Sequence, residues 1–118
     1  MVTTESFNPE EFRRIATSLV LGDSSEASFR TAINRLYYAV FLATREALGI
    51  SGSRTIHGRV YGELRRYDRL AGERLQRLFE LRLLADYVLD VADPLRNDWQ
   101  RNYQMARRLA NFVLERLR

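Results

Sequence analysis

The sequence contains no cysteine, no lysine, a single histidine and only two prolines in 118 residues. Without cysteine the chain forms no disulfide, no thiolate zinc site and no cysteine nucleophile. The single histidine, His57, excludes a histidine pair acting on a metal or in acid–base catalysis. We therefore expect neither a metal nor a cofactor.

Long apolar runs are also missing. No stretch approaches the roughly 20 apolar residues that cross a bilayer. Residues 1–7 lack the basic and apolar regions of a signal peptide. These absences predict a cytoplasmic protein that does not associate with a membrane.

All 19 basic residues are arginine, against 15 acidic residues, for a net charge of +4. Arginine suits the bidentate recognition of phosphate, as on a nucleic-acid surface. A compositional bias that replaces lysine throughout explains the same observation, and the scattered positions favour it. Positive charge is nevertheless concentrated in residues 54–82 and 94–118, each with a net charge of +4. The helices over 54–67 and after 94 are therefore candidate basic surfaces.

Helical periodicity dominates the sequence. Apolar residues recur at intervals of three and four, whereas the alternation and turn signals of β-strands are missing. The length suits one domain with a core of its own. We predict a single all-α domain over residues 1–118, folded as a five-helix, up-and-down antiparallel bundle.

Start and stop signals divide this domain into helices. Asn8 and Pro9 begin the first helix, with Glu11 completing a capping box and Phe7 packing on Phe12. The predicted breaks fall at three glycines, Gly22, Gly49 and Gly72. The predicted helices cover residues 9–22, 26–48, 54–67 and 72–91, and the last runs from between 94 and 98 to the C-terminus.

The second helix carries a segment, residues 36–43, in which every residue is apolar or tyrosine. A helix that is apolar all round must be covered all round. We predict that this is the central helix and that a second chain covers one of its faces.

Arg82 and Asp86 interrupt an otherwise apolar stripe of the fourth helix. Arginine before aspartate at this spacing is the weaker order for an isolated helical pair. A half-buried pair that orders a site or an interface is one interpretation. A simple intrahelical salt bridge at the edge of the core is the other.

His57 falls near the start of the third helix. There the helix dipole lowers the pKa of the imidazole and keeps it neutral, so that it can act as a base. The alternative is a histidine that caps or hydrogen-bonds the loop.

A polar and aromatic cluster lies in the second helix, where Asn34 and Arg35 precede Tyr37 and Tyr38. Aromatic rings beside arginine can stack nucleobases. Core packing, with the hydroxyl groups bonded to neighbours, is the competing interpretation.

Three segments, in this order and spacing, resemble a known family. They are AINRLYYAVF at 32–41, RTIHGRV at 54–60 and LRLLADY at 81–87. Together they resemble the HEPN domain (higher eukaryotes and prokaryotes nucleotide-binding), most closely its uncharacterised prokaryotic single-domain subgroup, over nearly the whole chain. The resemblance implies a helical bundle, often a homodimer, that binds a nucleotide or RNA. It also implies a small nucleotidyltransferase as partner, in a toxin–antitoxin or defence module.

Some members of this family are metal-independent ribonucleases that carry an arginine and, a few residues on, a histidine at the dimer cleft. Arg82 matches that arginine and Tyr87 the trailing tyrosine, but Asp86 takes roughly the place of the histidine. An aspartate beside an arginine stays ionised and is a poor general acid. The resemblance thus favours a non-catalytic binding module. The alternative is an atypical ribonuclease that uses Arg82 and Asp86 with His57 or Tyr87.

Residues that would contact a ligand follow from the matched segments and the cluster described above. The candidates are Asn34, Arg35, Tyr37, Tyr38, Arg54 and Arg59.

Overall fold

The structure is a computed structural model that describes residues 8–51, 57–88 and 97–118. The predicted packing of Phe7, the candidate Arg54 and the predicted start of the third helix lie outside the described residues. Within them the chain is all-helical and contains no strand, which confirms the predicted fold class. The helices are α1 (Pro9–Gly22), α2 (Glu26–Leu48), α3 (His57–Tyr67), α4 (Arg69–Tyr87) and α5 (Trp99–Arg116).

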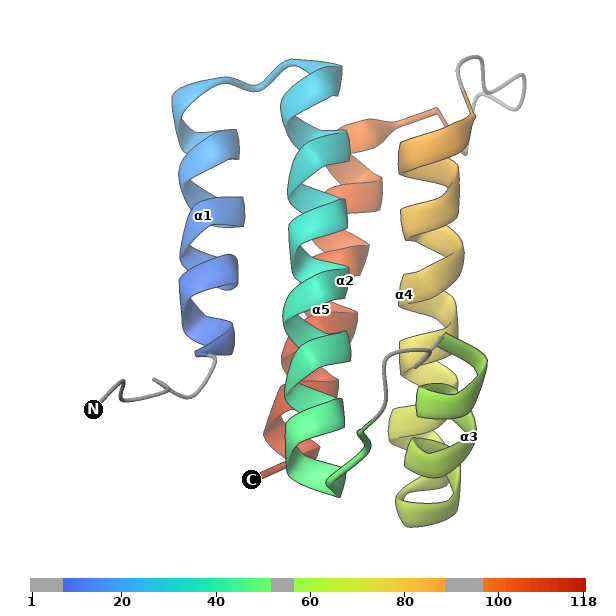
Figure 1. Ribbon diagram of the computed structural model, residues 1–118. Coiled ribbons are helices and arrows are strands. Elements are labelled where there is room, and N and C mark those ends of the chain that lie inside the picture. Colours follow the sequence, from blue (N-terminus) through green and yellow to red (C-terminus); the bar gives the residue numbers. More distant parts are fainter. Residues whose placement is uncertain (1–7, 52–56, 89–96) are drawn as a thin grey trace.

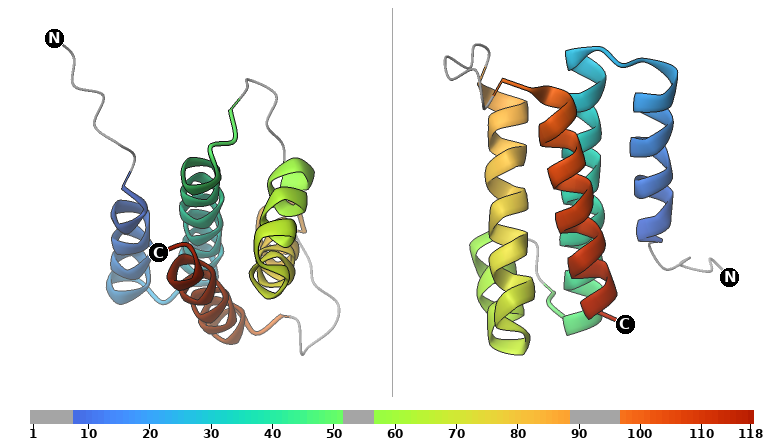
Figure 2. Two further views of the ribbon diagram at one scale, coloured as in Figure 1. Left: turned by 90° about the horizontal axis from the view of Figure 1, so that it is seen from below. Right: turned by 180° about the vertical axis from the view of Figure 1, so that it is seen from behind.

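The long helices form an antiparallel bundle. Helices α1, α2, α4 and α5 alternate in direction, whereas the short α3 runs the same way as α2 and packs on α4 (Figure 1). In the described part of the chain, α2 contacts all four other helices, while α1 packs against α2 alone (Figure 2). Helix α2 is therefore the central helix, as predicted.

The apolar segment 36–43 of α2 is covered almost entirely by the chain itself. Only Tyr38 and Leu42 within it are half-buried, and the other six residues are buried. The neighbouring helices thus provide most of the cover that the sequence predicts for this segment, and the cover by a second chain stays a prediction.

The first two helices begin at side-chain caps. Asn8 Oδ1 accepts a hydrogen bond from the Glu10 amide at 3.0 Å, as predicted. The carboxylate of Glu11 pairs with Arg14 at 2.9 Å instead of completing the expected capping box, because an oppositely charged group lies one turn along the helix. Ser25 caps α2, and Gly49 ends it in the left-handed conformation, with φ of 64°.

Gly72 lies inside α4, and the prediction that the helix begins there is wrong. The side chain of Asp68 caps the helix by accepting from the Ala71 amide at 3.2 Å. A Cβ atom on Gly72 would lie 2.7 Å from the Cα atom of Arg65 in α3. The glycine therefore permits the close approach of α3 and α4, which a single residue connects.

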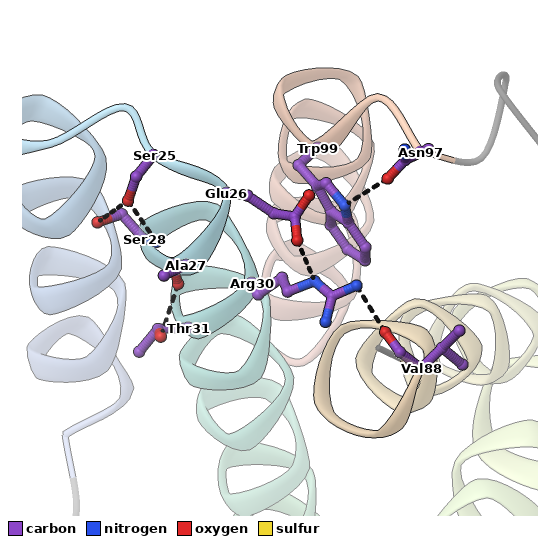
Figure 3. Close-up of polar contacts among 9 residues, drawn as sticks. All are labelled: Ser25, Glu26, Ala27, Ser28, Arg30, Thr31, Val88, Asn97 and Trp99. Carbon is purple, nitrogen blue, oxygen red and sulfur yellow. Dashed lines mark hydrogen bonds and ion pairs between the residues drawn. The ribbon is translucent and has the colours of Figure 1, made fainter. Parts of the chain in front are cut away.

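Helix α4 ends at Tyr87, short of the predicted Val91, because Val88 is extended. The carbonyl oxygen of Val88 accepts a hydrogen bond from Arg30 Nη2 at 2.6 Å (Figure 3). The same guanidinium lies 4.3 Å from the centroid of the buried Trp99 ring, in cation–π geometry. Arg30 thus joins α2 to the end of α4 and the beginning of α5.

The core runs along the inner faces of α2, α3, α4 and α5. Each large side chain buried there contributes about 1.5–3 kcal/mol by leaving water. The largest fully buried apolar side chains are those of Ile33, Leu64, Leu75, Leu78, Val40, Val60 and Val113. In the described ranges, no helix has the length and apolar character needed to cross a membrane.

Candidate functional site

Helices α2, α3 and α4 border a hollow of about 600 Å³ that is open to solvent. This volume falls within the range of roughly 300–1,000 Å³ that is typical of small-ligand sites. We refer to it as the Arg82 hollow. It is lined by Tyr37, Tyr38, Phe41, His57, Gly58, Phe79 and Arg82.

The hollow is assembled by helical spacing. Phe79, Arg82 and Asp86 follow one another at intervals of three and four residues, which places them on one stripe of α4. Side chains on this stripe contact Asn34 and Tyr38 of α2.

Arg82 and Asp86 form a half-buried ion pair. Arg82 Nε lies 2.8 Å from Asp86 Oδ2, and their side chains are 15% and 21% exposed. The buried Nε–H is not aimed at this oxygen, so the contact is an ion pair without an aligned hydrogen bond. Asn34 Nδ2 donates to the same oxygen at 2.8 Å. The pair therefore does more than bridge one helix, because it also fastens α4 to α2.

The Arg82 guanidinium is surrounded by tyrosines. It lies 5.6 Å from the ring centroid of Tyr37, 5.4 Å from that of Tyr38 and 5.5 Å from that of Tyr87. Arg82 Nη2 also donates to the Tyr38 hydroxyl at 3.3 Å. These contacts hold the cation in place at the wall of the hollow.

Both ring nitrogens of His57 are hydrogen-bonded. Gln76 directs its amide nitrogen to Glu80 at 3.5 Å, so its Oε1 faces His57 and accepts from Nε2–H at 2.8 Å. Nδ1 is then the acceptor, and the Tyr37 hydroxyl donates to it at 2.8 Å. The ring thus links α3 to α2 and α4.

Burial is the largest cause of a lowered pKa of His57, and the positive charge of Arg82 lowers it further. The hydrogen bond with Gln76 opposes these effects. The predicted direction of the pKa shift is therefore confirmed. Its main cause is desolvation against the ring of Phe79, whereas the sequence suggested the helix dipole.

Burial also raises the pKa of the Tyr37 hydroxyl well above its usual value, although the charge of Arg82 opposes the shift. The hydroxyl therefore remains protonated at neutral pH and serves as the donor to His57. Tyr37 Oη, His57 and Gln76 form one directed chain of hydrogen bonds along the wall of the hollow.

The structure brings some of the candidate residues together and not others. Asn34 binds Asp86, whereas Arg59 points to the carbonyl of Ser51 at 3.1 Å, outside the hollow. Arg35 is half-buried in α2 and does not line the hollow, and Arg54 lies outside the described residues.

Sequence reasoning overlooked Gln76, Phe79 and Phe41 as site residues. Phe79 precedes Arg82 on the same stripe, and that spacing is a signal that could have found it. Nothing in the sequence marks Gln76, because its role depends on the position of α3 beside α4. Across the described residues, no cluster of three histidine, aspartate or glutamate side chains is placed to hold a metal ion.

No protein-family profile, no curated protein and no solved structure matches this chain. Inference about function therefore rests on the residues of the Arg82 hollow and on the motifs of the sequence.

Proposed function

We propose that this chain is a non-catalytic, HEPN-type binding module that takes a nucleotide or a short segment of single-stranded RNA into the Arg82 hollow. The observation that carries the proposal is a fixed guanidinium at the wall of an aromatic-lined hollow of about 600 Å³. A cation beside ring faces offers phosphate binding and base stacking together.

The contacts of Arg82 support this proposal. Asp86 and the Tyr38 hydroxyl hold the guanidinium, while its side chain still lines the hollow. Because its position is fixed before a ligand arrives, little side-chain entropy is lost on binding. The half-buried ring of Tyr38 supplies an apolar face on which a base can stack.

The state of the titratable groups supports a binding role without catalysis. At neutral pH a histidine with a lowered pKa is not in the imidazolium form and is therefore a poor general acid, and both nitrogens of His57 are already engaged. Tyr37 remains protonated, and Asp86 is held by Arg82 and Asn34.

Binding of fluorescein-labelled oligouridylate and oligoadenylate, measured by fluorescence anisotropy, tests the proposal. We expect Arg82→Gln to weaken binding by roughly 10- to 100-fold, since a charge-assisted hydrogen bond contributes about 1.5–3 kcal/mol. Arg59→Gln removes the same charge outside the hollow and serves as the control. Equal affinities of the wild type and the Arg82 variant would exclude the hollow as the binding site.

Ribonuclease activity is the second candidate, because the fold brings His57 and Arg82 to the same hollow. A neutral His57 could accept the proton of a ribose 2′-hydroxyl once Tyr37 releases Nδ1, while Arg82 stabilises charge on the phosphate. Total RNA incubated with the protein without metal, beside Arg82→Ala and His57→Ala, tests this function. Cleavage that both substitutions abolish would support the ribonuclease over the binding module.

The proposed assembly is a cytoplasmic homodimer or a complex with a small nucleotidyltransferase, as the family resemblance implies. Exposed apolar residues support a contact beside Arg82, since Leu83 and Tyr87 of α4 are 36% and 68% exposed. Light scattering on the wild type and on Tyr87→Glu tests the homodimer. A monomeric wild type at high concentration would contradict it.

A further inference from the structure

A second surface lies along the seam of α4 and α5. Arg77 and Arg101 flank a groove of about 310 Å³, whose lining includes Leu81 and Met105. The two helices run side by side on the face seen from behind in Figure 2. We refer to this surface as the arginine groove.

The α5 side of the arginine groove belongs to a longer stripe of that helix. On α5, Arg101, Met105, Arg108 and Phe112 recur at intervals of four and three, so they share one face. This face meets α4, because Arg77 Nη2 lies 3.8 Å from Met105 Sδ.

Arg74 lies one turn before Arg77 on α4. Its guanidinium lies 5.5 Å from the ring centroid of Phe112. The two contacts across the seam, Arg77 with Met105 and Arg74 with Phe112, place four arginines, Arg74, Arg77, Arg101 and Arg108, along one seam.

Among the described residues, none of these four arginines has a carboxylate partner. Seven ion pairs join described residues, and none of them includes Arg74, Arg77, Arg101 or Arg108. The acidic residues nearby are fewer than the arginines: Glu80 on α4, and Asp98 and Glu115 at the two ends of α5.

Glu80 lines the groove and accepts from Gln76 at 3.5 Å, while Asp68 is held by Arg116 at 2.6 Å. The four arginines therefore outnumber the carboxylates beside them, and the seam carries an excess of positive charge in the described part of the chain.

The arginine groove and the Arg82 hollow lie on different sides of α4. Arg77 and Arg82 are five residues apart, which corresponds to a rotation of about 140° around the helix. The hollow faces α2 and α3, whereas the groove faces α5.

We infer that the arginine groove binds the phosphodiester backbone of single-stranded RNA, as a second contact for the nucleic acid of the proposed function. The cations are spread along the helices, with Arg101 and Arg108 about 10 Å apart along the axis of α5. A linear array of cations suits a polymer of phosphates better than a single anion. Leu81 and Met105, which line the groove, are half-buried between arginines. Insertion into a membrane needs exposed apolar side chains, so this surface does not fit that role.

The salt dependence of binding to labelled oligouridylate tests the inference. Each phosphate contact contributes about 0.7 to the slope of log K against log salt concentration for a single strand. We expect Arg77→Gln with Arg101→Gln to lower the magnitude of the slope by about 1.4. The matched control is Arg65→Gln with Arg107→Gln, which removes two exposed arginines elsewhere and should leave the slope unchanged.

The inference is overturned if the slope is unchanged in the Arg77 and Arg101 double variant, or if the matched control loses as much slope. It is also overturned if poly-glutamate binds with the affinity of RNA, which would assign the groove to an acidic protein. Circular dichroism confirms that each variant is folded.

The variants also separate the inference from the proposed function. If the groove alone is wrong, Arg82→Gln weakens binding while the Arg77 and Arg101 double variant binds as the wild type does. If the hollow alone is wrong, the double variant loses slope and Arg82→Gln binds normally.

Discussion

The imidazole ring of His57 lies flat against the ring of Phe79, with centroids 3.6 Å apart and planes inclined by 10°. This stacking removes water from one face of the imidazole, while Tyr37 and Gln76 occupy its two nitrogens. A proton added to His57 must therefore enter a desolvated ring beside the charge of Arg82. The protonation of this single histidine reports directly on the integrity of the hollow.

We predict that His57 titrates below the usual value of 6.5 in the folded protein. The measurement is a pH titration of the imidazole resonances by NMR, which is unambiguous because the chain has one histidine. Phe79→Ala should move the pKa back toward 6.5, because the substitution opens one face of the ring to water. A wild-type pKa at or above 6.5 would contradict the observed packing.

The same shift predicts how stability depends on pH. Because the folded state holds the proton less tightly than the unfolded chain, protonation favours unfolding. The contribution of His57 is complete above about pH 7 and is lost as the pH falls through 6.5 toward the lower folded-state pKa. Urea unfolding between pH 7.5 and 5 should show a falling free energy of unfolding, with a smaller fall in His57→Gln. Identical profiles for the two proteins would exclude His57 as the titrating group.

Loss of the Asp86 carboxylate should affect the binding of RNA through the ion pair with Arg82. Asp86→Asn should tighten the binding of RNA, because the charge of Arg82 is no longer neutralised, while an acceptor remains for Asn34. Fluorescence anisotropy measures this affinity. Combining Asp86→Asn with Arg82→Gln should abolish the gain, and a gain that persists would place the bound phosphate elsewhere.

A double-mutant cycle of Arg82→Ala and Asp86→Ala should give a coupling free energy of about 1 kcal/mol in urea unfolding. Asp86→Ala alone should cost about 1–2 kcal/mol, less than the 3–5 kcal/mol of a fully buried pair, because solvent still reaches both side chains. A coupling near zero would show that the pair contributes nothing to the fold.

Gly72→Ala should destabilise the protein by about 1–3 kcal/mol, because its Cβ atom would meet the backbone of Arg65. Thermal unfolding followed by circular dichroism measures the change. Gly62→Ala is the matched control, since a Cβ atom there meets nothing within 4 Å. This control should be neutral or stabilising by up to about 1 kcal/mol, as expected for alanine in a helix. Equal effects of the two substitutions would mean that α3 and α4 are further apart.

Arg30→Ala should lower the free energy of unfolding by about 2 kcal/mol, because it removes the bond to the Val88 carbonyl and the contact with Trp99. Arg30→Lys should restore only part of this loss, since an ammonium group cannot lie flat on the indole ring. Denaturant unfolding followed by Trp99 fluorescence reads out both effects. Arg14→Ala on the exposed face of α1 is the control and should change stability by less than about 0.5 kcal/mol.

Several features of the fold follow from local patterns in the sequence. The spacing of apolar residues predicted the all-helical class, and the predicted range of 26–48, ending before Gly49, matches α2. The proximity of Arg82 and Asp86 also followed from their spacing on a helix.

Other predictions failed where a tertiary contact outweighed a local signal. The sequence predicts a helix boundary at Gly72, whereas this glycine lies inside α4 and permits the close packing of α3 on α4. The charge distribution suggested the helices over 54–67 and after 94 as basic surfaces; only the packing of α4 on α5 brings Arg77 of α4 beside Arg101 of the last helix.

By itself, the sequence determined which segments are helical and which side chains are neighbours within a helix, because backbone geometry fixes both over a few residues. Only the tertiary structure decided that His57 bonds both Tyr37 and Gln76, and that α4 presents Arg82 to one side and Arg77 to another. These relationships depend on the rotation and crossing of whole helices. The close packing of the entire core sets that arrangement, and no single segment encodes it.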